Sequence, residues 1–305
     1  MKLPALLCVA AAWVASAGAA GATPAEPPCP AGVPKVAFVF EGPAWEPHRS
    51  ARDAVAGHLG GAVCVRTFDH LAAGVDPDAN ARFLLGTLGL ERYALVFLLT
   101  PRHAEALGRV APQFPATTFL QLEGQRPAPN LVPYRLDHYQ AGRVAGLITA
   151  ARSTTGAIAY AHGSAPGPRR AWDRGLAAGA KRVRPDVQLS EWTSADLSHT
   201  QPDAFAVSGA SAGELASLAA NDAPVVAWSE TPPPAADGKV VRLWADWQPF
   251  YLAAAQCAVS GRKWKAASVV AGIAQGVISG DARARASSGW QEERRRAGTA
   301  APLCY

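Results

Sequence analysis

Ser211 is the residue whose surroundings most resemble a catalytic motif. It stands in Gly209-Ala210-Ser211-Ala212-Gly213, which has the spacing of a nucleophile elbow and lies between a run typical of a strand and a run typical of a helix. A hydrolase of this kind takes its histidine from later in the chain, but all seven histidines precede Ser211. The pattern therefore favours a serine that caps a helix. A serine hydrolase that uses Ser211 is kept as an alternative.

His162 and Ser164 form a second polar pair, in the sequence His162-Gly163-Ser164. A catalytic histidine needs a third group to orient it, and the sequence offers none, so we interpret this pair as the lining of a cleft. The chain contains no Cys-x-x-Cys, no His-x-x-x-His and no glycine-rich phosphate loop that ends in Gly-Lys-Ser or Gly-Lys-Thr. We therefore expect no catalytic residue, no metal and no cofactor.

Tryptophans and carboxylates gather in the segments that follow expected strands. An aromatic ring can stack on a planar ligand, and a carboxylate accepts hydrogen bonds from hydroxyl or ring N–H groups. Together they favour a small, neutral ligand that is rich in donors. Core packing is the alternative for each tryptophan, and a solvated loop position is the alternative for each acid. The candidate ligand-binding residues are Glu41, Trp45, Thr100, His162, Trp172, Trp228, Glu230, Asp246 and Trp247.

Strands and helices that alternate along the chain must position these residues. One series runs from residue 35 to 151 and a second begins at residue 156, which predicts two parallel sheets with right-handed crossovers. Ligands of such folds bind at the carboxyl ends of the strands. The expected strands are 35–41, 62–68, 93–100, 117–122, 131–136, 157–161, 187–193, 204–208, 225–229 and 239–244, with a strand or hairpin at 268–278. The expected helices are 49–59, 78–90, 138–151, 169–182, 212–220, 249–260 and 281–296. The strand-end loops are 41–48, 100–103, 123–130, 162–170, 208–213, 230–234 and 245–249.

The first 22 residues have the pattern of a cleaved export signal. Lys2 is followed by an apolar run over residues 3–14 that is too short for a membrane anchor. Small residues at 15–17 and 20–22 suit signal cleavage. A buried core helix is the alternative. No cysteine stands where lipid attachment would need one, so we expect a soluble periplasmic or secreted form.

Charge and cysteine content agree with an exported binding protein. Without Lys2 the chain has 28 Lys and Arg against 24 Asp and Glu, a charge of +4. The arginine run 294–296 follows two glutamates, which is typical of a solvated helix face, and we expect no nucleic acid partner. Removal of Cys8 leaves four cysteines, which allow three pairings. We favour Cys29–Cys64 and Cys257–Cys304, because each bond ties a chain end to a nearby element.

Several stretches resemble one family of transport receptors. They are KVAFVFEGPAW (35–45), APNLVPYRLDHYQAGRVAG (128–146), IAYAHG (158–163), GLAAGAKRVRP (175–185), LWADWQPFY (243–251) and GIAQGVI (272–278). From about residue 35 to 278 the chain is similar to the basic membrane protein family, the purine-nucleoside-binding receptors of ABC importers.

This resemblance implies a type I periplasmic binding protein fold, in which two Rossmann-like lobes joined by three crossings close on a ligand. It implies that Trp45 flanks the base and that Asp246 and Trp247 line the cleft near the hinge. Glu230 stands at or beside the place of an Asp that grips the ligand. The chain departs from the family where Glu41-Gly42-Pro43 replaces a loop rich in Asp and Asn.

These inferences predict a periplasmic, monomeric receptor that captures a nucleoside or purine and delivers it to an ABC permease in the inner membrane. A ligand sensor of the same fold is the alternative. The expected organisation is a signal peptide (1–22), a Pro-rich linker (23–34), an N-terminal lobe (35–137 with 239–280), a C-terminal lobe (138–238), and a C-terminal helix and tail (281–305).

Overall fold

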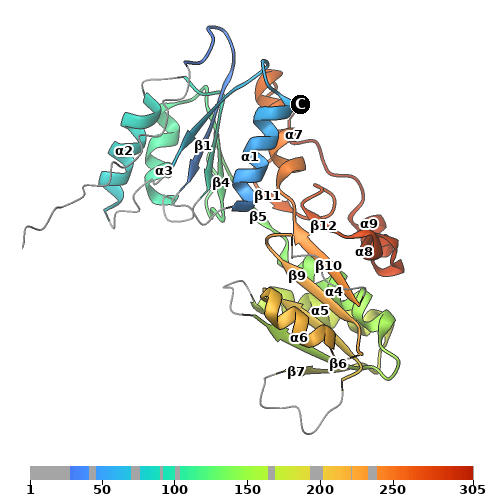
Figure 1. Cartoon of the computed structure of the whole chain (residues 1–305). Coiled ribbons are helices and arrows are strands. Elements are labelled where there is room, and N and C mark those ends of the chain that lie inside the picture. The colour runs from blue at the N-terminus through green and yellow to red at the C-terminus, as the bar shows by residue number, and fades with distance from the viewer. Residues whose placement is uncertain are drawn as a thin grey trace, which may run out of the picture.

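The chain folds into two α/β lobes, each built on a mostly parallel sheet (Figure 1). The structure is a computed structural model that describes residues 28–40, 46–69, 76–89, 92–99, 104–163, 169–192, 202–220, 222–232 and 239–304. The expected α/β fold class is confirmed. The expected signal peptide lies outside the described residues.

The first sheet has the strand order β11-β5-β4-β3-β1-β2, and its described pairs are all parallel. Alternate residues of each strand point to opposite faces. One face packs against helices α1 and α7, and the other packs against α2 and α3. The bounds are β1 Lys35–Phe40, β2 Cys64–Phe68, β3 Leu95–Leu99, β4 Thr118–Leu122, β5 Leu131–Leu136, β11 Val269–Ala271, α1 Glu46–His58, α2 Pro77–Gly89, α3 Ala104–Val110 and α7 Gln248–Val259.

The second sheet has the order β12-β10-β9-β8-β6-β7, in which β12 is antiparallel to β10. Helix α6 packs against one face through Leu215 and Leu218. Helices α4 and α5 lie on the other side, in close contact with each other. The bounds are β6 Ala157–His162, β7 Gln188–Glu191, β8 Ala204–Ser208, β9 Val225–Ser229, β10 Val240–Ala245, β12 Ile278–Gly280, α4 His138–Arg152, α5 Arg169–Val183 and α6 Ala212–Ala220.

Three crossings of the chain connect the lobes: β5 into α4, β10 into α7, and β11 into β12. This corrects the expected assignment of residues 239–280 to the N-terminal lobe, because β10 and β12 pair in the second sheet while α7 and β11 belong to the first lobe. Of the strand or hairpin expected at 268–278, the structure contains the short strand β11 and no hairpin, because the next strand, β12, pairs in the other sheet. An apolar run marks a buried strand but does not specify which sheet edge it joins.

The two ends of the chain are covalently fixed to the first lobe. The structure confirms the expected disulfides: Cys29 bonds Cys64 with 5.7 Å between their Cα atoms, and Cys257 bonds Cys304 with 5.9 Å. Each Cα separation is normal for a disulfide. Because Cys64 begins β2 and Cys257 lies in α7, both bonds attach a tail to an element of that lobe.

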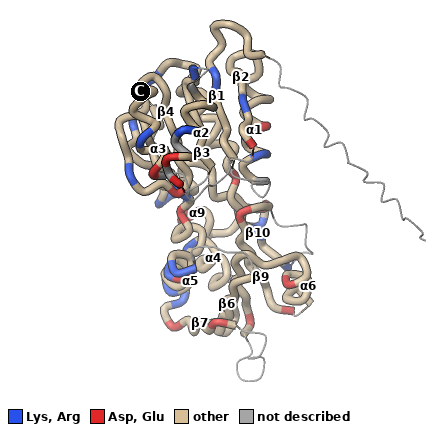
Figure 2. The backbone as a smooth tube through the Cα atoms, turned by 90° about the vertical axis from the view of Figure 1, so that its left-hand side faces the viewer, with Lys and Arg blue, Asp and Glu red and all other residues tan. Residues whose placement is uncertain are grey.

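The helix expected at 281–296 is two helices, α8 (Ala282–Ala286) and α9 (Ser288–Ala297). Asp281 caps α8 by accepting a hydrogen bond from the N–H of Ala284, and Ser287 caps α9 by accepting one from Trp290. Two N-cap side chains six residues apart start two helices. All three arginines of the 294–296 run are exposed on α9, and Figure 2 shows further basic residues gathered around α5.

Glycines allow the backbones of α4 and α5 to touch. Gly142 and Gly146 of α4 and Gly175 and Gly179 of α5 each face a backbone carbonyl of the opposite helix, so closely that a Cβ at any of them would collide with it. Ordinary helix pairs are separated by side chains. These four glycines therefore set the distance between α4 and α5.

We predict that Gly146→Ala destabilises the protein by about 3 kcal/mol or more, because the new methyl group meets the carbonyl of Leu176. The matched control is Gly86→Ala in α2, where nothing lies near the added Cβ and the change is expected to be neutral or to stabilise by up to about 1 kcal/mol. Urea unfolding measures both. Equal effects of the two substitutions would contradict the close backbone contact.

A buried chain of polar side chains joins α1, α7 and β5. Nδ1 of His48 lies 2.5 Å from the hydroxyl of Tyr251, which lies 2.8 Å from the hydroxyl of Tyr134. Burial lowers the pKa of His48 to about 3. His48 therefore stays neutral in the folded protein near pH 6.5, where an exposed histidine becomes protonated.

Stability must fall in acid as a result. Below pH 6.5 His48 binds a proton in the unfolded chain but not in the folded chain. Each further pH unit therefore lowers the free energy of unfolding by about 1.4 kcal/mol, until the pH approaches the pKa of His48 in the folded chain. We predict that His48→Asn reduces the loss of unfolding free energy between pH 7 and pH 5, measured by urea titration. Part of the loss remains in this variant, because burial also lowers the pKa of His138, to about 4. His58→Asn, an exposed position on the same helix, is the control, and an unchanged slope in His48→Asn would refute the assignment.

Candidate ligand-binding cleft

A pocket of about 250 Å³ lies where the two lobes and one crossing meet. Pro47 and Ser50 of α1 line it from the first lobe, and Pro232, after β9, lines it from the second. The remaining wall is the crossing from Trp244 to Gln248. The pocket thus lies at the carboxyl ends of strands, the position at which open α/β sheets bind ligands.

Asp246 is the carboxylate in this wall. It is partly buried, and its Oδ1 accepts a hydrogen bond from the N–H of Gln248 at 3.1 Å. Burial raises the pKa of Asp246 above its ordinary value, although the hydrogen bond opposes this shift. Because the charged form of the carboxylate has lost solvation, a hydrogen-bond donor beside it would be favourable.

Glu230 and Glu123 bring carboxylates from opposite lobes near each other. Glu230 follows β9 of the second lobe and Glu123 follows β4 of the first. Both residues are exposed, but the protein around the Glu230 carboxylate displaces much of the bulk water, and this raises its pKa. The negative charge of Glu123 raises the pKa of Glu230 further. The two acids consequently repel each other across the cleft.

Glu123 was not among the residues chosen from the sequence. It is the one described residue other than glycine with a positive φ, at 54°, and strained backbone of this kind concentrates at functional sites. Its N–H donates to the carbonyl of Tyr134 at 2.7 Å, which fixes the turn. The loop 123–130 had been identified as a strand end, and that is the signal by which Glu123 could have been found.

Trp247 borders the pocket with an aromatic cluster behind it. Its ring centroid lies 5.2 Å from that of His48, 5.9 Å from Tyr251 and 5.6 Å from Tyr134. Only 5% of Trp247 is exposed. The cluster holds the ring in one orientation, so Trp247 is a rigid wall of the pocket.

The structure corrects the interpretation of Trp172 and Trp228 as open stacking surfaces. Their exposed fractions are 1% and 3%, and both belong to the largest hydrophobic core. Each large ring gains more from packing between helix and sheet than from exposure. Core packing, the alternative weighed for each tryptophan, describes these two.

His162 ends β6 with its side chain largely buried. Its Nε2 lies 2.8 Å from Oδ1 of Asp173, and its ring meets Trp172 edge-on at 5.5 Å. These contacts fix the ring within the second lobe. Among the other candidates, Glu41, Trp45 and Thr100 lie outside the described residues.

Ser211 is a helix cap in the structure. Its N–H donates to Oε2 of Glu214 at 2.6 Å, and its Oγ accepts from the N–H of Glu214 at 3.3 Å. This reciprocal pair is a capping box at the start of α6, and it accounts for the spacing of the motif without catalysis.

Within the described ranges, no three His, Cys, Asp or Glu side chains come together as a metal site would require. Each helix that the structure describes is too short or too polar to cross a bilayer.

Solved structures with similar folds include three with substantial overlap. A transcriptional activator of the comK gene from Bacillus halodurans has a TM-score of 0.64 at 17% identity, over 86% of this chain and 94% of that one. A solute-binding protein of an ABC transporter system from Conexibacter woesei has a TM-score of 0.57 at 19% identity, over 81% and 88%. A solute-binding protein from Aeropyrum pernix has 0.55 at 16% identity, over 84% and 81%. At these identities the likeness shows the fold alone.

The sequence itself matches one family. No curated protein matches the chain, but the profile of the Bmp family, described as PnrA-like ABC transporter substrate-binding proteins, matches residues 83–197. This confirms the resemblance found in the sequence over a segment that begins within α2 and ends six residues beyond β7. The chain thus carries the signature of the PnrA-like substrate-binding proteins over residues 83–197, on the fold of the type I periplasmic binding proteins.

Proposed function

We propose that this protein is the periplasmic receptor of an ABC importer and captures a small neutral ligand, a nucleoside or a purine, without changing it chemically. The observation that carries the proposal is the pocket to which both lobes and the crossing at Asp246 contribute. The family match and the fold support a substrate-binding receptor. The two disulfides fit an exported protein.

The carboxylates support a ligand that donates hydrogen bonds. Within the described part of the chain, Asp246 and Glu230 have no ion-pair partner, and both have raised pKa values. Hydroxyl and ring N–H groups of a nucleoside or purine would satisfy these acceptors. An anionic ligand would add to the repulsion that already exists between Glu123 and Glu230.

Closure of the lobes is the proposed mechanism. The three crossings form a hinge, and a ligand that contacts both lobes binds the closed arrangement more tightly and shifts the population towards it. Repulsion between Glu123 and Glu230 opposes closure in the empty protein, because closure brings the two acids nearer to each other. The permease in the inner membrane would then distinguish loaded receptors from empty ones by their closed lobes, with the receptor acting as a monomer.

Isothermal calorimetry of the purified mature protein tests the ligand class. We expect saturable heat with at least one of adenosine, guanosine, inosine and hypoxanthine, and a raised melting temperature with the same compound. Glucose and ribose are the comparison sugars. Flat titrations with every nucleoside and purine would refute the ligand class, and a response to a sugar alone would replace it.

Asp246→Asn tests the site once a ligand responds. We predict at least a tenfold loss of affinity, because the substitution removes a charged acceptor, worth about 1.5–3 kcal/mol when it accepts a hydrogen bond. Asp222→Asn is the control, since Asp222 is exposed in the second lobe and is ion-paired with Lys239. Equal affinities of the two variants would place the ligand elsewhere.

A further inference from the structure

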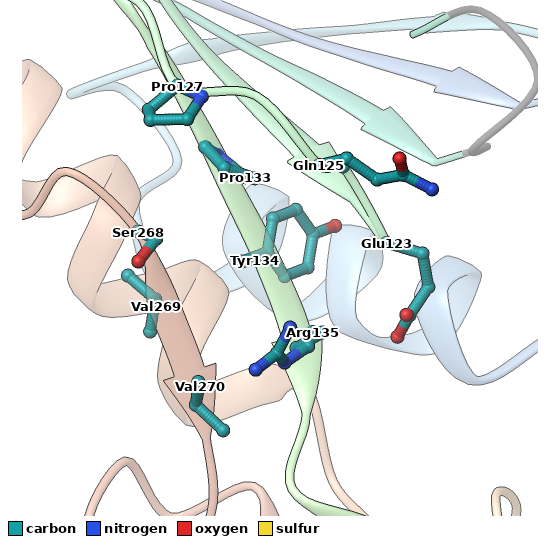
Figure 3. Close-up of a pocket in the computed structure, with 10 residues that line it drawn as sticks. Glu123, Gln125, Pro127, Pro133, Tyr134, Arg135, Ser268, Val269 and Val270 are labelled. Carbon is teal, nitrogen blue, oxygen red and sulfur yellow. The ribbon is translucent and has the colours of Figure 1, made fainter. Parts of the chain in front are cut away.

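A second and larger pocket lies on the first lobe, beside the cleft (Figure 3). Its volume is about 430 Å³, within the range of small-molecule sites. The loop after β4 forms one wall, while β5 and the edge strand β11 form the others. Arg135 of β5 pairs in register with Val270 of β11. Helices α2 and α3 pack on β1, β3 and the start of β4 and β5, which leaves the outer ends of β5 and β11 open.

One cationic and one anionic side chain line the pocket. Arg135 and Glu123 both line it and both are exposed, and Figure 3 shows their side chains extending in different directions. The protein around the Glu123 carboxylate displaces bulk water and raises its pKa, while a backbone hydrogen bond from Leu136 and the charge of Arg135 lower it. Within the described residues neither group has an ion-pair partner, so the guanidinium and the carboxylate lie close enough to interact yet remain separate. A molecule with both charges could bridge them.

An unsatisfied amide lies against the wall of this pocket. Gln121 is 1% exposed, and its Nε2 has no hydrogen-bond partner among the described residues. A Cβ on Gly124 would lie 2.7 Å from Oε1 of Gln121 and 2.9 Å from Cβ of Pro133, and both Gly124 and Pro133 line the pocket. A buried donor without an acceptor costs about 1–3 kcal/mol. The amide lies behind the pocket wall that Gly124 and Pro133 form.

The remaining surface of the pocket is largely apolar. Pro127 and Pro133 lie on one side, and Val270 lies on the other with 43% of its surface exposed. A valine that is exposed to this degree beside two prolines is an apolar surface, and burial of this surface by an apolar group of a ligand is favourable. The pocket therefore combines three separate preferences: for an anion, for a cation and for a hydrocarbon.

We propose that this pocket binds a free α-amino acid with an apolar side chain. The carboxylate of the amino acid binds the guanidinium of Arg135, and its ammonium group binds Glu123. The side chain covers Pro127, Pro133 and Val270. Arg135 suits the carboxylate because its planar guanidinium can form two parallel hydrogen bonds. The two pockets share no lining residue, although Glu123 also acts on Glu230 across the cleft, and this site would hold a second ligand.

Calorimetry with L-valine tests the proposal, with L-leucine and L-proline as further probes. Each charge is tested separately: N-acetyl-L-valine lacks the ammonium group and L-valinamide lacks the carboxylate. We expect at least one of the three amino acids to bind, and the matching derivatives to bind at least tenfold more weakly. Absence of heat with all three amino acids would overturn the proposal, and so would equal binding of the derivatives.

Variants locate the site. Arg135→Gln and Glu123→Gln should each weaken the binding of the amino acid at least tenfold, whereas Arg126→Gln, an exposed arginine of the same loop outside the pocket, should not. Asp246→Asn should leave amino acid binding unchanged, which separates this site from the proposed nucleoside site. Urea unfolding confirms that each variant is folded. If binding is lost in Asp246→Asn and retained in Arg135→Gln, the amino acid occupies the cleft and the proposal fails.

Discussion

Backbone hydrogen bonds between the three crossings hold the two lobes in one arrangement. The N–H of Asp137 in the first crossing donates to the carbonyl of Ala271 in the third at 2.9 Å. The N–H of Asp246 in the second donates to the carbonyl of Val277 at 2.7 Å. Each crossing is therefore bonded to another, and the lobes can rotate only by bending these segments together. The candidate cleft inherits its geometry from this constraint, because Asp246 and Trp247 belong to the second crossing itself.

A buried ion pair extends this constraint to the C-terminal helix. Oε1 of Gln140 in α4 accepts from the N–H of Ile273 at 2.8 Å, and its Nε2 donates to Glu293 of α9 at 3.3 Å. Glu293 is fully buried and pairs with Arg143 at 2.6 Å. A buried charge persists only when it is paired and hydrogen-bonded, so α9 is fixed against the hinge. Arg296 also pairs with Glu293 at 2.9 Å, so two arginines compensate this buried charge where the crossings meet.

Most of the secondary structure could be predicted from the sequence, for a local reason. The strands at 131–136, 204–208 and 225–229 and the helix at 212–220 have the predicted bounds, because short apolar runs between turn residues specify buried elements. Pairing depends on distant residues, and β10 and β12 of the segment 239–280 were therefore assigned to the wrong lobe, whereas α7 and β11 were assigned to the right one. The single helix predicted at 281–296 is two helices, because Ser287 caps the second one. The sequence pattern did not indicate this break.

The site was less predictable, because its geometry depends on both lobes. The sequence placed Asp246, Trp247 and Glu230 at strand ends, and the cleft pocket includes the first two. It could not distinguish Trp247, which borders the pocket, from Trp172 and Trp228, which are buried in the core. Residue type and position along the chain identified these candidates, and neither property shows which face of a strand or helix is covered by other elements. Glu123 was missed because it is marked by its backbone angle and not by an unusual sequence.

The Cys257–Cys304 bond has a mechanical consequence for the open state. From Cys257 the chain passes through β11 in the first lobe, then through β12 and α8 beside the second sheet, and returns from α9 to its starting point. Residues 257–304 are thus a closed covalent ring that spans both lobes. The final stretch, 298–303, can extend over no more than about 20 Å. The ring acts as a tether of fixed length, and it limits how far the lobes can separate even when every hydrogen bond of the hinge is broken.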